Sequence, residues 1–112
     1  MKQLDPATTE AVRRFAELLQ VRYHPLEVIL FGSRARGTHR ADSDADVAVI
    51  LDGEPERFVA TKLAMSDIAY DILLDMGVNI SPLPVWLDQW RHPDRYSNPE
   101  LLENIAREGI RL

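Results

Sequence analysis

Two aspartates lie two positions apart at the start of an apolar segment: Asp44 and Asp46 precede the run 47–51. In a strand, side chains at positions i and i+2 share a face and are separated along it by roughly 6 to 7 Å. Two ionised carboxylates this close repel each other, and a hard cation such as Mg²⁺ with oxygen ligands is the usual remedy. The spacing therefore predicts a metal site at Asp44 and Asp46.

A turn rich in anion donors comes before this pair. Gly32 allows the chain to turn sharply after the apolar run 26–31, and Ser33 offers a hydroxyl and an N–H at the expected start of a short helix. Arg34 and Arg36 follow, and arginine suits phosphate because its planar fork holds two oxygens at once. Further donors in this turn are His39 and Arg40. The turn thus predicts a phosphate-binding site formed by Gly32, Ser33, Arg34 and Arg36.

Composition limits the partners that such a site can serve. The 112 residues are enough for one domain with a core, but leave no room for a separate substrate domain. There are 13 Lys plus Arg against 18 Asp plus Glu, and a net charge of −5 argues against nonspecific nucleic-acid binding. The chain has no cysteine, no basic and apolar leader and no apolar run of membrane length. We therefore expect a cytoplasmic protein whose basic turn binds a small polyphosphate.

The elements that must position these residues follow from apolar spacing. It predicts a first helix over 6–22, and the nearly continuous apolar run 26–31 predicts a central strand covered on both faces. The second strand is 47–51, and a long helix is expected over 54–76, ended by Gly77. Its expected buried residues are Phe58, Met65, Ile68, Ala69, Ile72, Leu73 and Met76. Its charged residues expected to face solvent are Glu56, Arg57, Lys62 and Asp67.

A third strand is expected at 78–81, where apolar and polar residues alternate and Asn79 and Ser81 fall on the polar side. Pro82 and Pro84 each remove a ladder donor, which predicts an edge position or an early exit from the sheet.

The end of the chain predicts one more helix, begun by Asn98 and Pro99 and ended by Gly109. The apolar tail 110–112 is expected to dock on the body of the protein or on another subunit. The whole order of elements predicts an α/β (α+β) sandwich, with helices packed against a small mixed sheet.

Gly32-Ser33, followed by Asp44-x-Asp46 and an apolar strand, resembles the signature of the polymerase-β-like nucleotidyltransferase superfamily. The longer string Phe-Gly-Ser-Arg-Ala-Arg-Gly, continued by Ser-Asp-x-Asp, is similar to its minimal nucleotidyltransferase branch. The resemblance extends over about 28–85. It implies the nucleotidyltransferase fold, with 1–112 as a single minimal nucleotidyltransferase domain and the active site at the strand ends.

The resemblance also implies a reaction. An acceptor hydroxyl attacks the α-phosphorus of a nucleoside triphosphate and pyrophosphate leaves, with two Mg²⁺ ions about 3.5 to 4 Å apart on the attacking and leaving oxygens. Asp44 and Asp46 are the implied metal ligands and catalytic residues. In this superfamily a third carboxylate follows the long helix, and Asn79 stands at its expected position. An amide oxygen can ligate a metal, but it brings no negative charge and does not take a proton as a carboxylate does.

Minimal nucleotidyltransferases of this size often pair with a small all-helical HEPN toxin and act as its antitoxin, in some cases by adenylylating a tyrosine. The resemblance therefore implies ATP as donor and a HEPN protein as partner, in a homo- or hetero-oligomer. Two alternatives stay open. One is a binding module that neutralises its partner by occlusion or senses nucleotide, and the other is an antibiotic nucleotidyltransferase, which the lack of a second domain disfavours. The neighbouring reading frame would distinguish them.

Overall fold

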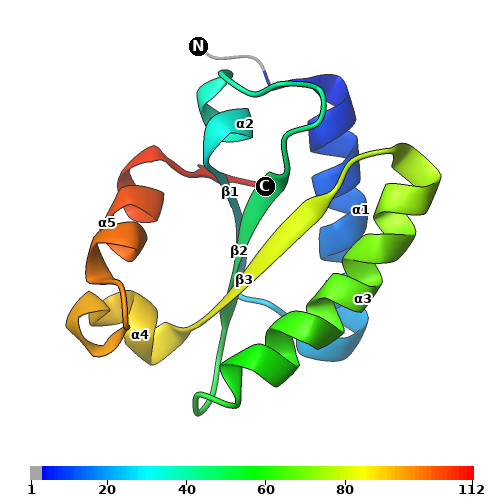
Figure 1. Ribbon diagram of the computed structural model, residues 1–112. Coiled ribbons are helices and arrows are strands. Elements are labelled where there is room, and N and C mark those ends of the chain that lie inside the picture. The colour runs from blue at the N-terminus through cyan, green and yellow to red at the C-terminus, as the bar shows by residue number, and fades with distance from the viewer. Residues whose placement is uncertain (1–3) are drawn as a thin grey trace.

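The computed structural model describes residues 4–112. Helices and strands follow one another in this order: α1 (Pro6–Tyr23), β1 (Glu27–Phe31), α2 (Ser33–Arg36), β2 (Ala45–Leu51), α3 (Phe58–Met76), β3 (Ile80–Trp86), α4 (Leu87–Arg91), the 3₁₀ turn η1 (Pro93–Arg95), α5 (Pro99–Glu108) and β4 (Ile110–Arg111) (Figure 1). No helix within 4–112 is long and apolar enough to cross a membrane.

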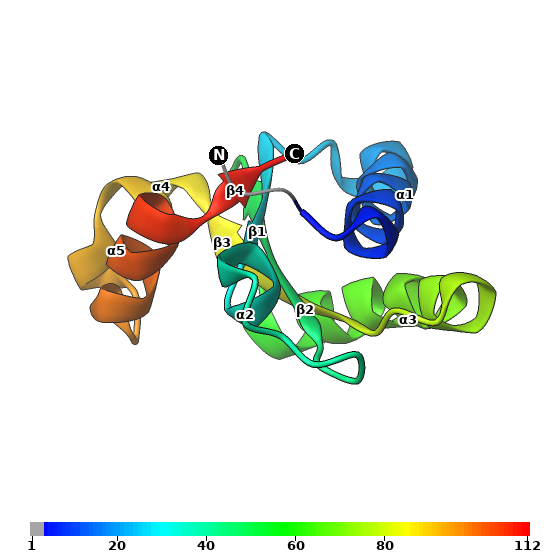
Figure 2. The ribbon, with the colours of Figure 1, turned by 90° about the horizontal axis from the view of Figure 1, so that it is seen from above.

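The sheet has the strand order β3-β2-β1-β4 and separates two layers of helices. β1 is antiparallel to both of its neighbours, β2 and β4, whereas β2 and β3 are parallel. Figure 2 shows α1 and α3 on one side of the sheet and α4 and α5 on the other. Each side has its own buried cluster, built on alternate residues of the same strands. The predicted sandwich with a small mixed sheet and a central first strand is confirmed.

Local signals in the sequence set most helix ends. α1 begins with Pro6 directly after Asp5, and the Asn98 side chain at the start of α5 accepts a hydrogen bond from the Leu101 amide at 3.2 Å. α3 ends at Gly77, whose φ of +72° a residue with a side chain adopts only with strain.

The start of α3 differs from the prediction. Residues 52–57 are exposed and carry the chain from β2 to the helix, so α3 begins at Phe58 rather than at 54. Phe58 itself is exposed, and the expectation that it is buried is wrong. The buried residues of α3 are Thr61, Met65, Ala69 and Ile72, and its partly buried ones include Ile68, Leu73 and Met76.

β3 lies at the edge of the sheet, as its prolines predicted, but it does not leave the sheet early. It runs on to Trp86 and pairs with β2 along its whole length. Pro82 and Pro84 are two positions apart, so their missing donors lie on the same side of the strand, away from β2, where no ladder is interrupted. At the other edge β4 pairs with β1, so the tail docks on the body.

Candidate functional site

The end of β1, the start of α2 and the start of β2 meet at one end of the sheet (Figure 1). Phe31, the last residue of β1, pairs with Asp46, which in turn pairs with Ser81 near the start of β3. Gly32 and Ser33 follow Phe31 directly and begin α2. The topology therefore brings both predicted motifs to the same edge, although a loop of several residues separates them in the chain.

Gly32 lies against the carboxylate of Asp46. Its φ is +75°, and a Cβ placed on it would collide with Asp46 Oδ2. A side chain at this position would thus be strained by the backbone and would also occupy the space of the carboxylate. The positive φ favours glycine here, and a side chain would in addition displace the Asp46 carboxylate.

Asp46 is the perturbed acid of the site. It is half-buried, and burial raises the pKa of its carboxyl, helped by the negative charge of Asp44. Lys62 and Arg36 act in the opposite direction and lower the same pKa. The pKa of Asp46 is thus raised by burial and by a neighbouring acid, and two nearby cations offset only part of this effect.

Asn79 lies beside Asp44. Its side-chain Nδ2 donates to Asp44 Oδ1 at 2.9 Å, and its backbone carbonyl accepts from the Ala45 amide at 2.8 Å. Asn79 precedes β3 and its side chain is exposed. The structure thus brings together the three positions predicted to be catalytic, while their catalytic role stays a prediction.

The donor set of this site fits a hard divalent cation. Within 4–112 there is no cluster of three or more His, Cys, Asp or Glu residues that could hold a metal ion. The site instead offers the carboxylates of Asp44 and Asp46. If the Asn79 side-chain amide rotates by about half a turn, so that its Nδ2 no longer donates to Asp44, its oxygen becomes a third ligand. Mutual repulsion of the carboxylates is what a cation relieves, and oxygen ligands suit Mg²⁺.

Arg36 connects the site to α5. Its Nη1 lies 3.9 Å from Glu108 Oε2, and its charge lowers the pKa of Asp46. Between Gly32 and α5 there is a cavity of about 230 Å³. Its lining residues are Phe31, Gly32, Arg36, Leu101, Asn104, Ile105 and Glu108. A larger hollow of about 500 Å³ shares Arg36 and Glu108 but not Gly32. Neither cavity is lined by an aspartate, and the smaller one is connected to the acids through Gly32, which lies against Asp46.

Ser33 is half-buried at the first position of α2. Among the described residues its hydroxyl has no hydrogen-bond partner. The hydroxyl and the first amides of α2 are therefore available to an anion at this end of the sheet.

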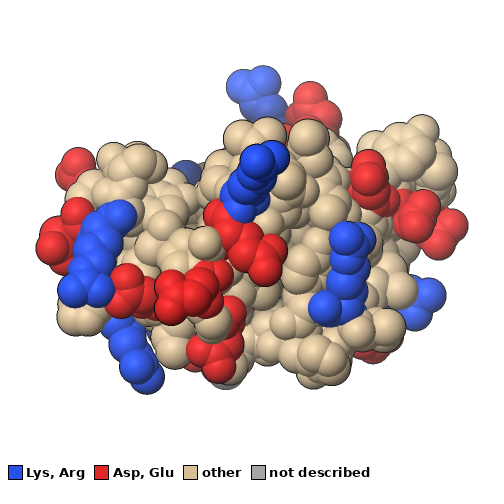
Figure 3. All heavy atoms as spheres, turned by 90° about the horizontal axis from the view of Figure 1, so that it is seen from below, with Lys and Arg blue, Asp and Glu red and all other residues tan. Residues whose placement is uncertain are grey.

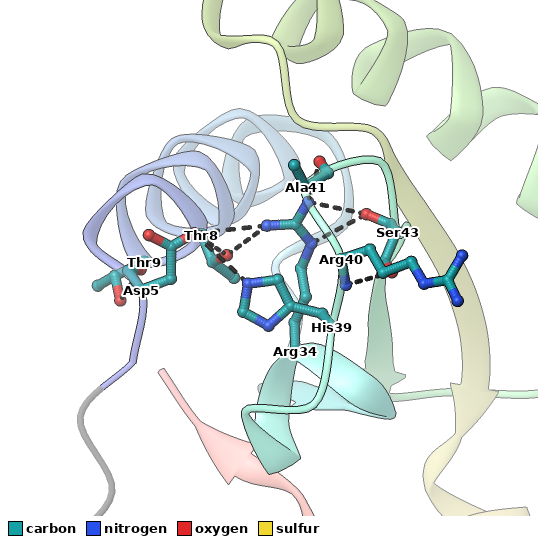
Figure 4. A network of polar contacts seen from close by, with 8 residues as sticks. All are labelled: Asp5, Thr8, Thr9, Arg34, His39, Arg40, Ala41 and Ser43. Atoms are coloured by element: carbon teal, nitrogen blue, oxygen red, sulfur yellow. Dashed lines mark hydrogen bonds and ion pairs between the residues drawn. The ribbon is translucent and has the colours of Figure 1, made fainter.

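Arg34 does not present its guanidinium to the site. It is only 4% exposed, and its Nε and Nη2 donate to the Ser43 carbonyl at 2.9 and 2.8 Å. Nη2 also donates to the Ala41 carbonyl at 3.2 Å, and Nη1 donates to Thr8 Oγ1 at 2.7 Å (Figure 4). The expectation of an accessible donor at Arg34 is therefore corrected. Its contacts support a role in holding the loop that leads to Asp44, and direct nucleotide binding by Arg34 stays a prediction.

Asp5, just before α1, completes this cluster. Its Oδ2 accepts from the Thr8 hydroxyl at 3.0 Å and lies 3.5 Å from Arg34 Nη1 and 3.8 Å from His39 Nε2. The Thr8 hydroxyl is the main reason that the pKa of Asp5 is lowered. His39, expected as a further phosphate donor, thus lies beside Asp5, and Arg40 is exposed and contacts Ser43 through its backbone amide.

Lys62 is the site residue that sequence reasoning missed. It was expected to face solvent, but it is half-buried and its Nζ donates to the Pro82 carbonyl at 2.8 Å. From there its charge lowers the pKa of Asp46. The proline-bearing edge strand was a usable signal, because the outward carbonyls of an edge strand need a donor.

Comparison with known proteins agrees with this geometry. Residues 12–106 match the family described as Nucleotidyltransferase domain, so the chain belongs to the nucleotidyltransferase family. Over 60 residues, or 54% of this chain, it is 40% identical to a Methanocaldococcus jannaschii protein named "Putative protein adenylyltransferase". The matched segment spans only 41% of that relative's length.

A solved structure gives the same fold. It is a crystal structure described as "a putative nucleotidyltransferase from Sulfolobus solfataricus", with a TM-score of 0.53. The match covers 99% of this chain and 89% of that chain, at 20% sequence identity. At this identity the likeness shows the fold alone.

Proposed function

We propose that this protein transfers a nucleoside monophosphate, with ATP as the donor, to a hydroxyl group of a partner protein, and that it acts as an antitoxin on a HEPN toxin. The observation that carries the transfer chemistry is the pair Asp44 and Asp46: burial and the charge of Asp44 raise the pKa of Asp46, which lies against Gly32. The name of the Methanocaldococcus jannaschii relative supports a protein as acceptor. The HEPN partner rests on the resemblance of the sequence to minimal nucleotidyltransferases.

Each residue of the site has its own role in this proposal. Asp44, Asp46 and the amide oxygen of Asn79 are the groups that would hold Mg²⁺, which when bound offsets phosphate charge and makes the attacking hydroxyl more acidic. The Ser33 hydroxyl and the first amides of α2 bind phosphate oxygens. Arg36 adds positive charge where α2 faces α5. Asn79 does not take the acceptor's proton, which therefore leaves with water or with a residue of the partner.

A second function from another class is favoured by the same asparagine. With an amide at the third position the site has one negative charge fewer than its resemblance implies. Such a site can bind Mg²⁺ and nucleotide and yet transfer slowly, so the protein would neutralise its partner by occlusion.

The test uses labelled ATP, Mg²⁺ and the purified product of the neighbouring gene. We expect the native protein to move the label to that product and Asp46→Asn to fail, whereas Asp42→Asn, an exposed acid of the same loop, behaves as the native protein. Mass spectrometry locates the modified residue. Binding of the partner without label transfer would overturn the transferase in favour of occlusion.

A further inference from the structure

The outer face of α3 carries a row of exposed apolar side chains. Val59, Leu63, Tyr70 and Leu74 are 67, 61, 57 and 65% exposed. Their spacing of four, seven and four residues places them on one side of the helix. The buried residues of α3 lie on the opposite side, against the sheet and α1. We call these four residues the α3 stripe. It extends over about 22 Å, at 1.5 Å per residue.

An acidic row runs beside the α3 stripe. Asp67, Asp71 and Asp75 are exposed and recur every four residues, so they lie along one flank of the helix. Within the described part of the chain none of the three forms an ion pair. Asp71 and Asp75 also line a hollow of about 230 Å³ together with Leu74 and with Arg14 and Leu18 of α1. The face is thus apolar in its centre and predominantly acidic on this flank.

We infer that this face is a docking surface for a basic amphipathic helix of a partner protein. An apolar seam on such a helix covers the α3 stripe, and its Lys or Arg residues lie against the acidic row. This inference does not depend on the transfer reaction. The stripe ends at Leu74, five residues before Asn79 in the sequence.

Charge disfavours the other occupants of this face. If α3 packed antiparallel on a second copy, the two acidic rows would lie side by side, and each chain already carries a net charge of −5. An anionic membrane surface attracts helices whose polar face is rich in Lys and Arg, and here that face is acidic. Both occupants remain outcomes of the test.

The test measures binding of designed helical peptides by fluorescence anisotropy. The probe is an amphipathic peptide of about 18 residues, enough to span the α3 stripe, with leucines in one seam and lysines on its flanks. A peptide with glutamates in place of the lysines and a scrambled leucine–lysine peptide are the controls. We expect the lysine peptide to bind the native protein, and both controls to bind at least about tenfold more weakly.

Two sets of variants connect the binding to this face. Leu63→Ser combined with Tyr70→Ser should weaken the lysine peptide by at least about tenfold. The same kind of change at the exposed Leu112, which follows the edge strand β4, should leave it unchanged. Asp67→Asn, Asp71→Asn and Asp75→Asn together should weaken binding and flatten its salt dependence. Unchanged thermal melting shows that each variant is folded.

The inference is overturned if the lysine peptide does not bind, if the scrambled or glutamate peptide binds as tightly, or if Leu112→Ser weakens binding as much as the stripe variant. Two sedimentation measurements test the other occupants: the oligomeric state of the protein, and its co-sedimentation with anionic vesicles. A dimer that Leu63→Ser dissociates would assign the face to a second copy. Binding to anionic vesicles that the same change abolishes would assign it to a membrane.

Discussion

Two polar clusters involve the loop 37–44, and they differ in how their charge is balanced. Arg34 contacts the Ala41 and Ser43 carbonyls of this loop, and Asp44 and Asp46 come directly after them in the chain. At the first, the buried Arg34 guanidinium is matched by carbonyl, hydroxyl and carboxylate oxygens (Figure 4). At the second, burial and the negative charge of Asp44 raise the pKa of Asp46. The first cluster is satisfied by the fold, and the second leaves charge that a ligand must offset. In this protein the two candidate metal ligands, Asp44 and Asp46, are acids that no ion pair within the described residues compensates.

Acids at the end of the molecule opposite α2 differ from Asp46 in their exposure to solvent. Figure 3 shows acidic and basic side chains side by side over that end, with acids gathered near its middle. The exposed acids of the connection 52–57, which are Asp52, Glu54 and Glu56, point into solvent, where water screens them. Acids at that end are numerous, and those of the connection 52–57 are exposed. Asp46 differs from them because it is half-buried beside a second acid.

The largest effect should come from adding a third charge to the uncompensated cluster. Asn79→Asp supplies a charged ligand and a proton acceptor beside Asp44, and general-base help is worth about 10² to 10⁴ in rate. We therefore expect transfer of label from ATP to rise far more than ATP affinity does. Single-turnover transfer and calorimetric binding, measured on both proteins, give the two quantities.

The thermal stability of Asn79→Asp in metal-free buffer gives a second test. It replaces the hydrogen bond from Asn79 to Asp44 by repulsion, so its melting temperature should fall below that of the native protein and recover on addition of Mg²⁺. Equal transfer by the native protein and Asn79→Asp would show that this position is not the third catalytic site.

Breaking the satisfied cluster should have the next largest effect. Arg34→Ala leaves the carbonyls of Ala41 and Ser43 without their donor and should lower the free energy of unfolding by about 3 kcal/mol. Arg34→Lys should not restore it, because a single ammonium does not reproduce the fork. Urea unfolding measures the loss, with Arg40→Ala at an exposed position as control. If Arg34→Ala kept its stability and lost only nucleotide affinity, Arg34 would be a phosphate ligand after all.

A smaller loss is expected where the glycine turn touches the acids. Gly32→Ala combines a positive φ with a collision against Asp46, whereas Gly53→Ala has a positive φ of +86° and open space around it. The Gly53 variant should lose about 1 kcal/mol through backbone strain alone. The Gly32 variant should lose more and should also bind Mg²⁺ with ATP more weakly. Equal losses of stability with unchanged binding would argue against the close approach of Gly32 to Asp46.

The smallest effect, and one of opposite sign, concerns Asp46 and pH. Its pKa in the folded protein is raised above the ordinary value of 3.8, so the folded state binds this proton more tightly than the unfolded chain does. The native protein therefore loses stability as the pH rises from 3.8 through the raised pKa. In metal-free buffer Asp46→Asn should accordingly be slightly more stable than the native protein at pH 7, and this gain should shrink as the pH falls toward 4. A variant that is less stable at pH 7 would identify Asp46 as a structural residue.

Much of the fold could be predicted because local chemistry determines it. The proline start of α1, the apolar run of β1 and the glycine end of α3 each depend on a few adjacent residues. The start of α3 and the full length of β3 could not be predicted in this way. The start of α3 depends on the path of residues 52–57 from β2 to the helix, and the length of β3 depends on its pairing with β2. Neither is encoded by a few adjacent residues.

The candidate site shows the same limit. Its positions could be predicted from the spacing of Gly32, Asp44 and Asp46, and Asn79 lies where the resemblance placed it. The contacts of Arg34 and Lys62 could not be predicted, because they join segments that are far apart in the sequence. Arg34 reaches back to Thr8 in α1, and Lys62 reaches across to the Pro82 carbonyl at the sheet edge.

The central claim is that the uncompensated acids are retained for a metal-bound nucleotide. Calorimetric titration of ATP into the native protein, with and without Mg²⁺, tests it most directly when Asp44→Asn, Asp46→Asn and the control Asp42→Asn are measured alongside. We predict that affinity depends on Mg²⁺, falls by at least about tenfold in the first two variants, as expected when a charged ligand is lost, and is unchanged in the control. ATP binding that is indifferent to Mg²⁺ and equal in all four proteins would contradict the account.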